Sequence, residues 1–469
     1  MRKESSEKQI SHATDRLGKD GIGKLLFTFS VPAVIGMLVN AFYNIVDRIY
    51  VGQGVDPLGI AGIAMAMPVM MVLMAASMFI GIGANVLFSI RLGEGRRHEV
   101  EKIMGHAFAL LFLVPAFFIV ISFIFIDEIL RDLIGASDAV FPYAKTYLEI
   151  ILYGGIFGAM GPGINHFIRS DGHPRTSMMT QILGAFVNII LDPIFIFVFD
   201  MGIAGAAWAT IISEFVSFLW VMIYFNSRWT HLRFRPSAMR LEGKLCLRIM
   251  AIGFAPFAMQ SALGLVNGVL NKSLEVHGGD LAVTAMGIVF SIHIVLIMPL
   301  QGLNQGVQAI AGYNYGAKKF DRVRRTYWLA IKCATIFVAA GFILFEFFPR
   351  VFIAAFRNEE GPLMELGVHV LRVVSIALPL IGFQIITSNF FQAIGKPVQG
   401  TILSLSRQIL FFIPIVIFLP RLVGLEGVFL TFPISDVLAS SLAALVMRRE
   451  VKSLKRKHKA AEAGDRAMG

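Results

Sequence analysis

The segment VPAVIGMLVNAFYNIVDRIYVG, residues 31–52, places one carboxylate, Asp47, in an otherwise apolar stretch long enough to span a membrane. The polar residues of the segment fall on one helical face: Asn40, Tyr43, Asn44 and Asp47. This stripe should face protein or water, because a charge in contact with lipid is costly. The segment therefore predicts a membrane-spanning helix with a polar inner face.

A second polar stripe lies in residues 179–199, where Asn188 and Asp192 are four residues apart. Two interpretations fit the two acids. In the first, each acid lies near a helix end in interfacial water, with Arg48 as a local partner of Asp47. In the second, the acids form a proton or cation site, because ionisable groups within membrane spans tend to line transport pathways.

The composition of the chain indicates a polytopic membrane protein. Of its 469 residues, 56% are hydrophobic and only 16% are charged, and the mean hydropathy is +0.71. The first 24 residues are polar and basic, and the apolar run that starts at Leu25 is longer than a signal-peptide core and lacks a small-residue cleavage site. We expect the first helix to be retained.

Twelve apolar spans are predicted, and their starts lie near residues 25, 58, 103, 140, 177, 203, 246, 281, 326, 363, 398 and 424. With the connections assigned alternately to two sides, one side holds 32 Lys and Arg residues and the other holds 6. By the positive-inside rule, both termini are cytoplasmic. The net charge of +11 thus reflects topology and some attraction to anionic lipid, and no nucleic-acid partner is expected.

The chain contains an internal repeat with an offset of 223 residues. Gly83, Gly93 and Val100 recur as Gly306, Gly316 and Val323, and Pro174 recurs as Pro397. Each half has six spans, so the repeat is parallel, with a pseudo-twofold axis along the membrane normal. The expected segments are an N-terminal segment 1–24, an N-lobe 25–226, a linker 227–245, a C-lobe 246–447 and a tail 448–469, which is expected to be disordered or to lie on the inner leaflet.

This topology places the two acids at a similar depth. Asp47 lies 22 residues past Leu25, or about 33 Å along a straight helix, in the outer half of the membrane. Asp192 precedes the outer connection at Asp200 by eight residues, or about 12 Å of helix. The common depth favours one shared site.

Five acids are expected within spans: Asp47, Glu149, Asp192, Glu214 and Asp436. Arg372 occupies the repeat position of Glu149. With the offset slipped by one residue, Glu214 and Asp436 match each other in the repeat, as an acid required by the fold would, whereas Asp47 and Asp192 occur only in the first half. An acid that couples transport to an ion need occur only once.

The sequence lacks the common motifs of catalysis and nucleotide binding: a phosphate-cradling glycine loop, GxSxG, HExxH and CxxC. We therefore expect no enzyme activity and no cofactor other than a coupling ion. Any uphill transport would draw on an ion gradient.

Several of these segments resemble the MATE (multidrug and toxic compound extrusion) transporters, in particular the prokaryotic DinF/MepA-like branch. They are YNIVDRIYVG in the first span, NIILDP in the fifth and GIAGAAWAT at the start of the sixth. Together with the repeat, the resemblance covers about residues 25 to 448. It implies an all-α fold of twelve transmembrane helices in two six-helix lobes.

The resemblance also implies a proton or sodium site in the N-lobe. The matching residues are Tyr43, Asp47, Asn165, Asn188, Asp192 and Thr210, and Pro32 matches the bend of the first helix in the family. The chain departs from the family in the seventh span, where Asn267 and Asn271 stand in place of an acid. A cation site in the C-lobe is therefore not expected.

We expect a secondary antiporter that exports lipophilic, cationic drugs in exchange for H⁺ or Na⁺ by alternating access. It would act as a monomer in the plasma membrane of a prokaryote, with small molecules and lipid as partners. One alternative is a lipid-linked oligosaccharide flippase, which needs a cationic cavity, and only Arg372 and Arg407 are candidates for it. A second is an integral membrane enzyme that uses His166, Asp171 and His173, although these lack metal-like spacing.

Overall fold

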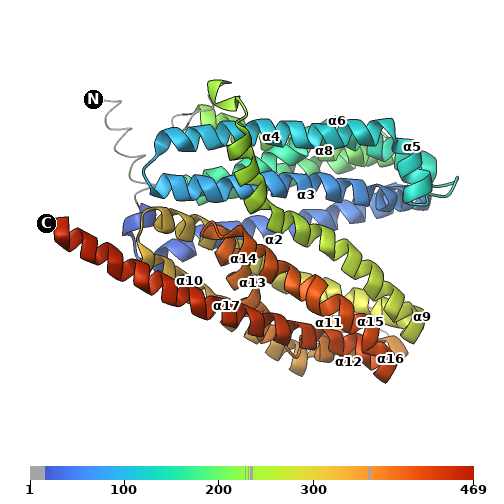
Figure 1. Ribbon diagram of the computed structural model, residues 1–469. Helices are drawn as coiled ribbons and strands as arrows, with labels where there is room; N and C mark the ends of the chain where they lie inside the picture. Colours follow the sequence, from blue (N-terminus) through green and yellow to red (C-terminus); the bar gives the residue numbers. More distant parts are fainter. Residues whose placement is uncertain (1–15, 228, 231, 233–235, 357–360, 469) are drawn as a thin grey trace. The chain divides into compact units, whose positions relative to one another are not determined.

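The structure is a computed structural model that describes residues 16–227, 229–230, 232, 236–356 and 361–468. These residues form helices joined by short turns, and no strand occurs among them (Figure 1). In chain order the helical elements are α2 (Ile22–Gly54), α3 (Pro57–Gly93), α4 (Arg97–Ile124), α5 (Ile126–Glu128), η1 (Ile129–Leu133), α6 (Phe141–Ser170), α7 (Pro174–Pro193), η2 (Ile194–Val198), α8 (Gly202–Asn226), η3 (Pro236–Met239), α9 (Gly243–Gly316), α10 (Phe320–Phe347), α11 (Pro349–Ala354), α12 (Pro362–Ser375), α13 (Leu378–Ala393), α14 (Pro397–Leu405), η4 (Ser406–Phe412), α15 (Ile413–Phe418), α16 (Pro420–Val423) and α17 (Leu425–Met468).

The helices of the described part of the chain confirm the twelve predicted spans. Ten helical stretches are long and apolar enough to cross a membrane, and α12 and α13 together form one more span, bent by 49°. One of the ten, α9, has 74 residues and is interrupted at Gly279, whose φ of 62° and ψ of −164° are not helical, so that it supplies two spans. Proline at the first position starts several of them, because its fixed φ suits the first turn, where an amide donor is not needed.

The predicted starts of the spans lie within six residues of the observed helix starts. The largest differences are at α4 and α10, which begin at Arg97 and Phe320 although their apolar runs begin near residues 103 and 326. The first turns of these two helices are charged, and apolar periodicity alone does not detect them.

The C-terminal tail differs from the prediction. Residues 448–469 were expected to be disordered or to lie on the inner leaflet, but α17 continues as a helix to Met468. Lys396 forms an ion pair with Glu450, which is largely buried, and Lys457 donates a hydrogen bond to the Tyr315 hydroxyl at 2.9 Å. The expected disorder was wrong, because Lys, Arg, Glu and Ala all favour helix and these contacts hold the helix against the second unit, whereas the inner-leaflet alternative stays a prediction.

The chain divides into two compact units. The first comprises Met1–Lys19 and Val31–Gly253, and the second comprises Asp20–Ser30 and Phe254–Gly469. These units differ from the expected lobes in that the start of α2 belongs to the second unit and the start of α9 to the first. The chain passes from one unit to the other after Ser30 and again after Gly253. These two boundaries are 223 residues apart, so they occupy the same position in the two repeats.

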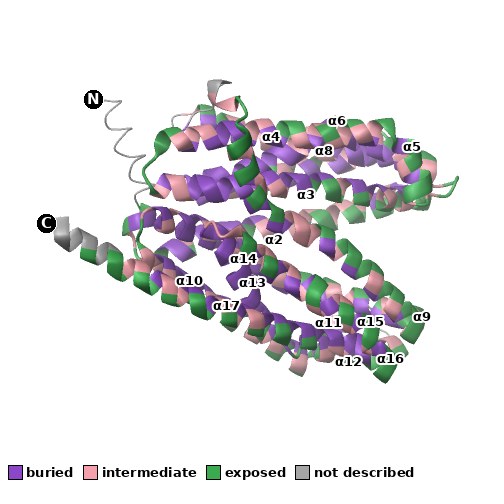
Figure 2. Ribbon diagram, in the orientation of Figure 1, coloured by how far each residue is buried: buried purple, intermediate pink, exposed green. Residues whose placement is uncertain are grey.

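The core of the first unit lies where α3, α6 and α8 pack together. Tyr147, Leu148 and Ile151 of α6 are buried there against Leu73 of α3. The helices approach closely, because a Cβ atom on Gly81 would lie 2.8 Å from the Cα atom of Gly163. Buried residues line the inner sides of the helices in each unit (Figure 2), while many large apolar side chains are exposed, as in a multi-pass membrane protein.

Candidate functional site

The two acids singled out in the sequence lie on α2 and α7. Tyr43 and Asp47 are one turn apart on α2, and Asn188 and Asp192 are one turn apart on α7. Proline at position 193 cannot donate a backbone hydrogen bond, and the helix continues after it as the wider turn η2. Such π-helical turns often occur at functional sites.

The structure brings the two acids together. The carboxyl groups of Asp47 and Asp192 lie within hydrogen-bonding reach of each other, and Asn188 Nδ2 donates to Asp192 Oδ1 at 3.4 Å. The side chain of Asp192 is fully buried, whereas Asp47 is half-buried. Two carboxyl groups at this separation can share a hydrogen bond only when one of them carries a proton, so the pair is a candidate proton site.

The surroundings of the pair support this assignment over the interfacial interpretation. Asp192 Oδ2 and Asn188 Oδ1 are buried and find no donor among the residues that the structure describes. Arg48 is close enough to Asp47 to affect it electrostatically, but no ion pair joins them in the described part of the chain. A proton on the pair, or a bound cation, would therefore give these buried oxygens the partner that the described residues do not supply.

Tyr147 of α6 belongs to the same cluster and was missed in the sequence. It is buried, and both Tyr43 and Tyr147 lie within electrostatic range of Asp47, Asp192 and Glu214. The sequence does contain a signal for it: its repeat position holds Val370, so Tyr147 shows the same asymmetry as the two acids.

Asn165 lies in a different cluster. Its Nδ2 donates to the Ser177 carbonyl at 3.1 Å, and Thr180 Oγ1 donates to its Oδ1 at 2.9 Å. Thr180 precedes Asp192 by twelve residues on α7, or about 18 Å of helix. The structure thus places Asn165 at the contact between α6 and the start of α7, and does not bring it to the acid pair.

The remaining candidates have varied surroundings. Thr210 donates its hydroxyl to the Ala206 carbonyl within α8 at 2.9 Å. Arg372 is exposed, and its Nε donates to the Glu346 carbonyl at 3.2 Å. Glu149 is half-buried on α6.

Pro32 and Asp436 are the last two of the residues predicted from the sequence. Pro32 is buried inside α2, two residues past the point at which the chain passes between the units. Asp436 is buried and forms an ion pair with Arg407.

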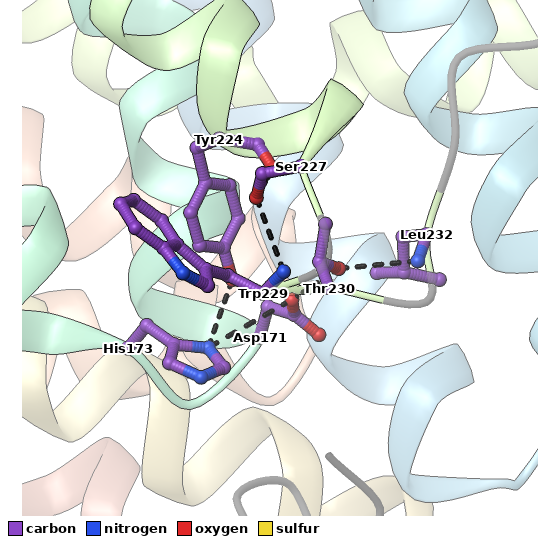
Figure 3. Close-up of polar contacts among 7 residues, drawn as sticks. All are labelled: Asp171, His173, Tyr224, Ser227, Trp229, Thr230 and Leu232. Atoms are coloured by element: carbon purple, nitrogen blue, oxygen red, sulfur yellow. Dashed lines mark hydrogen bonds and ion pairs between the residues drawn. The ribbon is translucent and has the colours of Figure 1, made fainter. Parts of the chain in front are cut away.

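A second polar cluster joins the turn between α6 and α7 to the end of α8 and the residues after it (Figure 3). Tyr224 and Thr230 donate their hydroxyls to Asp171 Oδ2 at 2.7 and 2.6 Å. Since the Tyr224 hydrogen is directed to Asp171, His173 Nδ1 donates to the Tyr224 oxygen, 2.8 Å away. The Thr230 oxygen in turn accepts from the Leu232 amide at 3.1 Å.

The electrostatics of this cluster follow from its burial. Burial raises the pKa of Asp171 to about 6, against the hydrogen bonds from Thr230 and Tyr224, which lower it. Burial also lowers the pKa of His173. Through Asp171, these hydrogen bonds connect Tyr224 at the end of α8 and Thr230 after it to the turn between α6 and α7.

Comparisons with known proteins agree with this fold. The MatE family model matches residues 32–194 and again 256–418, and each match opens at a proline, Pro32 or Pro256. The multidrug export protein MepA of Staphylococcus saprophyticus is 26% identical over 430 residues, covering 92% of this chain and 94% of that protein. MepA of Staphylococcus aureus is 26% identical over 429 residues with the same coverage.

Solved structures show the same architecture. The MATE multidrug transporter DinF-BH is 37% identical, with a TM-score of 0.85 over 92% of this chain and 96% of that one. An outward-facing multidrug resistance MATE transporter of the MOP superfamily is 24% identical, with a TM-score of 0.88 over 94% and 98% of the two chains. The fold and these relatives define a two-lobed membrane transporter. The chain belongs to the MatE family.

Proposed function

We propose that this protein is a secondary active multidrug efflux antiporter that exports lipophilic, cationic compounds by alternating access. The observation that carries the proposal is the approach of Asp47 and Asp192 beside the unpartnered Asp192 Oδ2, which would provide a proton site inside the membrane-spanning part of the first unit. The names of the MepA and DinF-BH relatives support multidrug export as the activity.

The coupling ion in this proposal is the proton. Sodium would require several oxygen ligands, whereas the acid pair needs only one proton to satisfy its own hydrogen bond. Loading the pair favours one conformation and substrate favours the other, because a ligand shifts an equilibrium only through its differential affinity for the two states. Each transport cycle would exchange at least one proton at the pair.

The location follows from the charge distribution. With 32 basic residues on one side and 6 on the other, both termini would face the cytoplasm across the plasma membrane of a prokaryote. One chain carries both six-span halves of the repeat, so the protein would work as a monomer. The flippase alternative has less support, because Arg407 is paired with Asp436 and Arg372 is exposed beside Glu346.

Everted membrane vesicles provide the test. With an acidic interior and the membrane potential clamped by potassium and valinomycin, we expect the vesicles to accumulate tetraphenylphosphonium, and a protonophore to abolish the uptake. A sodium gradient at constant pH should have no effect. Uptake driven by sodium alone would overturn proton coupling, and absence of any gradient-driven uptake would overturn the antiporter.

A further inference from the structure

Glu214 on α8 is a further carboxyl group of the first unit, and it has no counter-charge among the residues that the structure describes. A Cβ atom added to Gly158 of α6 would lie 2.3 Å from Glu214 Oε2, so glycine leaves the space that this carboxyl group occupies. Among the described residues, no hydrogen bond or ion pair of Glu214 is found, and no basic side chain lies near enough to neutralise it.

Glu214 faces the same polar cluster as the acid pair. Tyr43 and Tyr147 each lie within electrostatic range of Glu214 and also of Asp47 and Asp192. The three carboxyl groups therefore all interact electrostatically with the same two tyrosines. An acid in such a place is stable only when a proton or a bound cation neutralises it.

The repeat provides an internal comparison. Asp436, the counterpart of Glu214 in the second unit, is neutralised by Arg407. The repeat position of Arg407 in the first unit is Gly184, where a Cβ atom would already lie 2.3 Å from Ser217 Oγ. Glu214 and Asp436 occupy matching positions of the repeat, but among the described residues only Asp436 is paired with an arginine. The roles of these two acids therefore differ.

Aromatic rings lie beside Glu214 at the crossing of α6 and α8. The Phe157 ring packs against those of Phe215 and Phe218, with centroid distances of 4.9 and 5.5 Å. A carboxylate next to apolar aromatic surface suits a lipophilic cation, because the carboxylate binds the charge and the rings bind the organic groups around it.

We propose that Glu214 recognises the cationic group of the exported compound and carries a proton when that compound is absent. The proposal rests on the proposed function and names its substrate-recognition group. When the cation binds, the carboxyl group releases its proton to water and keeps a neutralising partner, so the site is uncharged overall in both states. The acid pair remains the coupling site.

The first test uses the wild-type protein. Dicyclohexylcarbodiimide modifies protonated carboxyl groups in apolar surroundings, and peptide mass spectrometry assigns the modified residue. We expect modification of Glu214 that saturating tetraphenylphosphonium suppresses roughly tenfold, as expected if both compete for one group. Neutral triphenylphosphine oxide should not suppress it, and Asp436 should stay unmodified. An unmodified Glu214, or modification that the cation leaves unchanged, would overturn the proposal.

The second test compares Glu214→Gln with Glu149→Gln, a matched change on α6 in the same unit. We expect Glu214→Gln to weaken binding of tetraphenylphosphonium to the purified protein roughly tenfold and to leave triphenylphosphine oxide binding unchanged. Glu149→Gln should bind both like wild type. If wild type transports but Glu214→Gln binds the cation equally well, only this inference fails. If wild type shows no gradient-driven transport, the proposed function fails, and the binding and labelling results still judge Glu214.

Discussion

Asp47 of α2 and Asp192 of α7 are 145 residues apart in the sequence, and their carboxyl groups lie within hydrogen-bonding reach of each other in the first unit. A hydrogen bond between them would need one proton for the two acids. The pair joins the first and fifth spans, so its protonation state would influence how these two helices pack.

Replacing either acid should uncouple transport. We expect Asp47→Asn and Asp192→Asn each to abolish uptake driven by a proton gradient in everted vesicles, because an amide cannot release the proton that the pair exchanges. Expression and thermal stability should stay close to those of the wild-type protein, because burying an amide costs less free energy than burying a charged carboxylate. Transport at near the wild-type rate in either variant would mean that the acid is structural.

The Tyr147 hydroxyl should contribute to coupling without contributing much to folding. We expect Tyr147→Phe to lower gradient-driven uptake by roughly tenfold, while the ring keeps its packing in the core. Tyr153→Phe, at an exposed position on the same helix, is the matched control and should transport like wild type. Equal rates in the two variants would exclude Tyr147 from the coupling cluster.

Asp171 should make the stability of the protein depend on pH. Its folded-state pKa of about 6 lies above its ordinary value of 3.8, so its contribution to stability is fully present below pH 3.8 and is lost as the pH rises through about 6. Between pH 5 and pH 8, the melting temperature of the wild-type protein should therefore fall by more than that of the Asp171→Asn variant. The asparagine oxygen can still accept hydrogen bonds from Tyr224 and Thr230. If the melting temperatures of the two proteins in detergent depended on pH in the same way, this prediction would be contradicted.

The crossing of α3 and α6 should not tolerate a side chain at Gly81. We expect Gly81→Ala to destabilise the protein by about 1–3 kcal/mol, because its Cβ would lie 2.8 Å from the Gly163 backbone. Gly52→Ala on α2 has no atom within 4 Å and serves as the control. Thermal unfolding of both variants in one detergent gives the comparison, and equal melting temperatures would show that the helices can separate at little cost.

The charge distribution predicts which connections are accessible from outside the cell. In a variant without Cys246 and Cys333, a membrane-impermeant maleimide added to intact cells should label Asp138→Cys and not Arg96→Cys. Both positions have exposed side chains, so access to the reagent should depend on the side of the membrane. The opposite labelling pattern would reverse the proposed orientation.

The sequence by itself determined the number of spans, the repeat and the two acids. Membrane spans are long apolar runs, and their length is set by the bilayer, so local composition is enough to find them. An acid within such a run is costly wherever the chain folds, and this made Asp47 and Asp192 visible before any contact was known.

Only the tertiary structure decided which polar groups meet. It joined Asp47 to Asp192, added Tyr147, placed Asn165 with Ser177 and Thr180, and gave Asp436 an arginine that Glu214 lacks. These contacts link residues on different helices, and their partners depend on how the helices are rotated and crossed, which periodicity along one helix does not specify. The same reason explains α17, whose charged end is held as helix by Lys396 and Tyr315 from distant parts of the second unit.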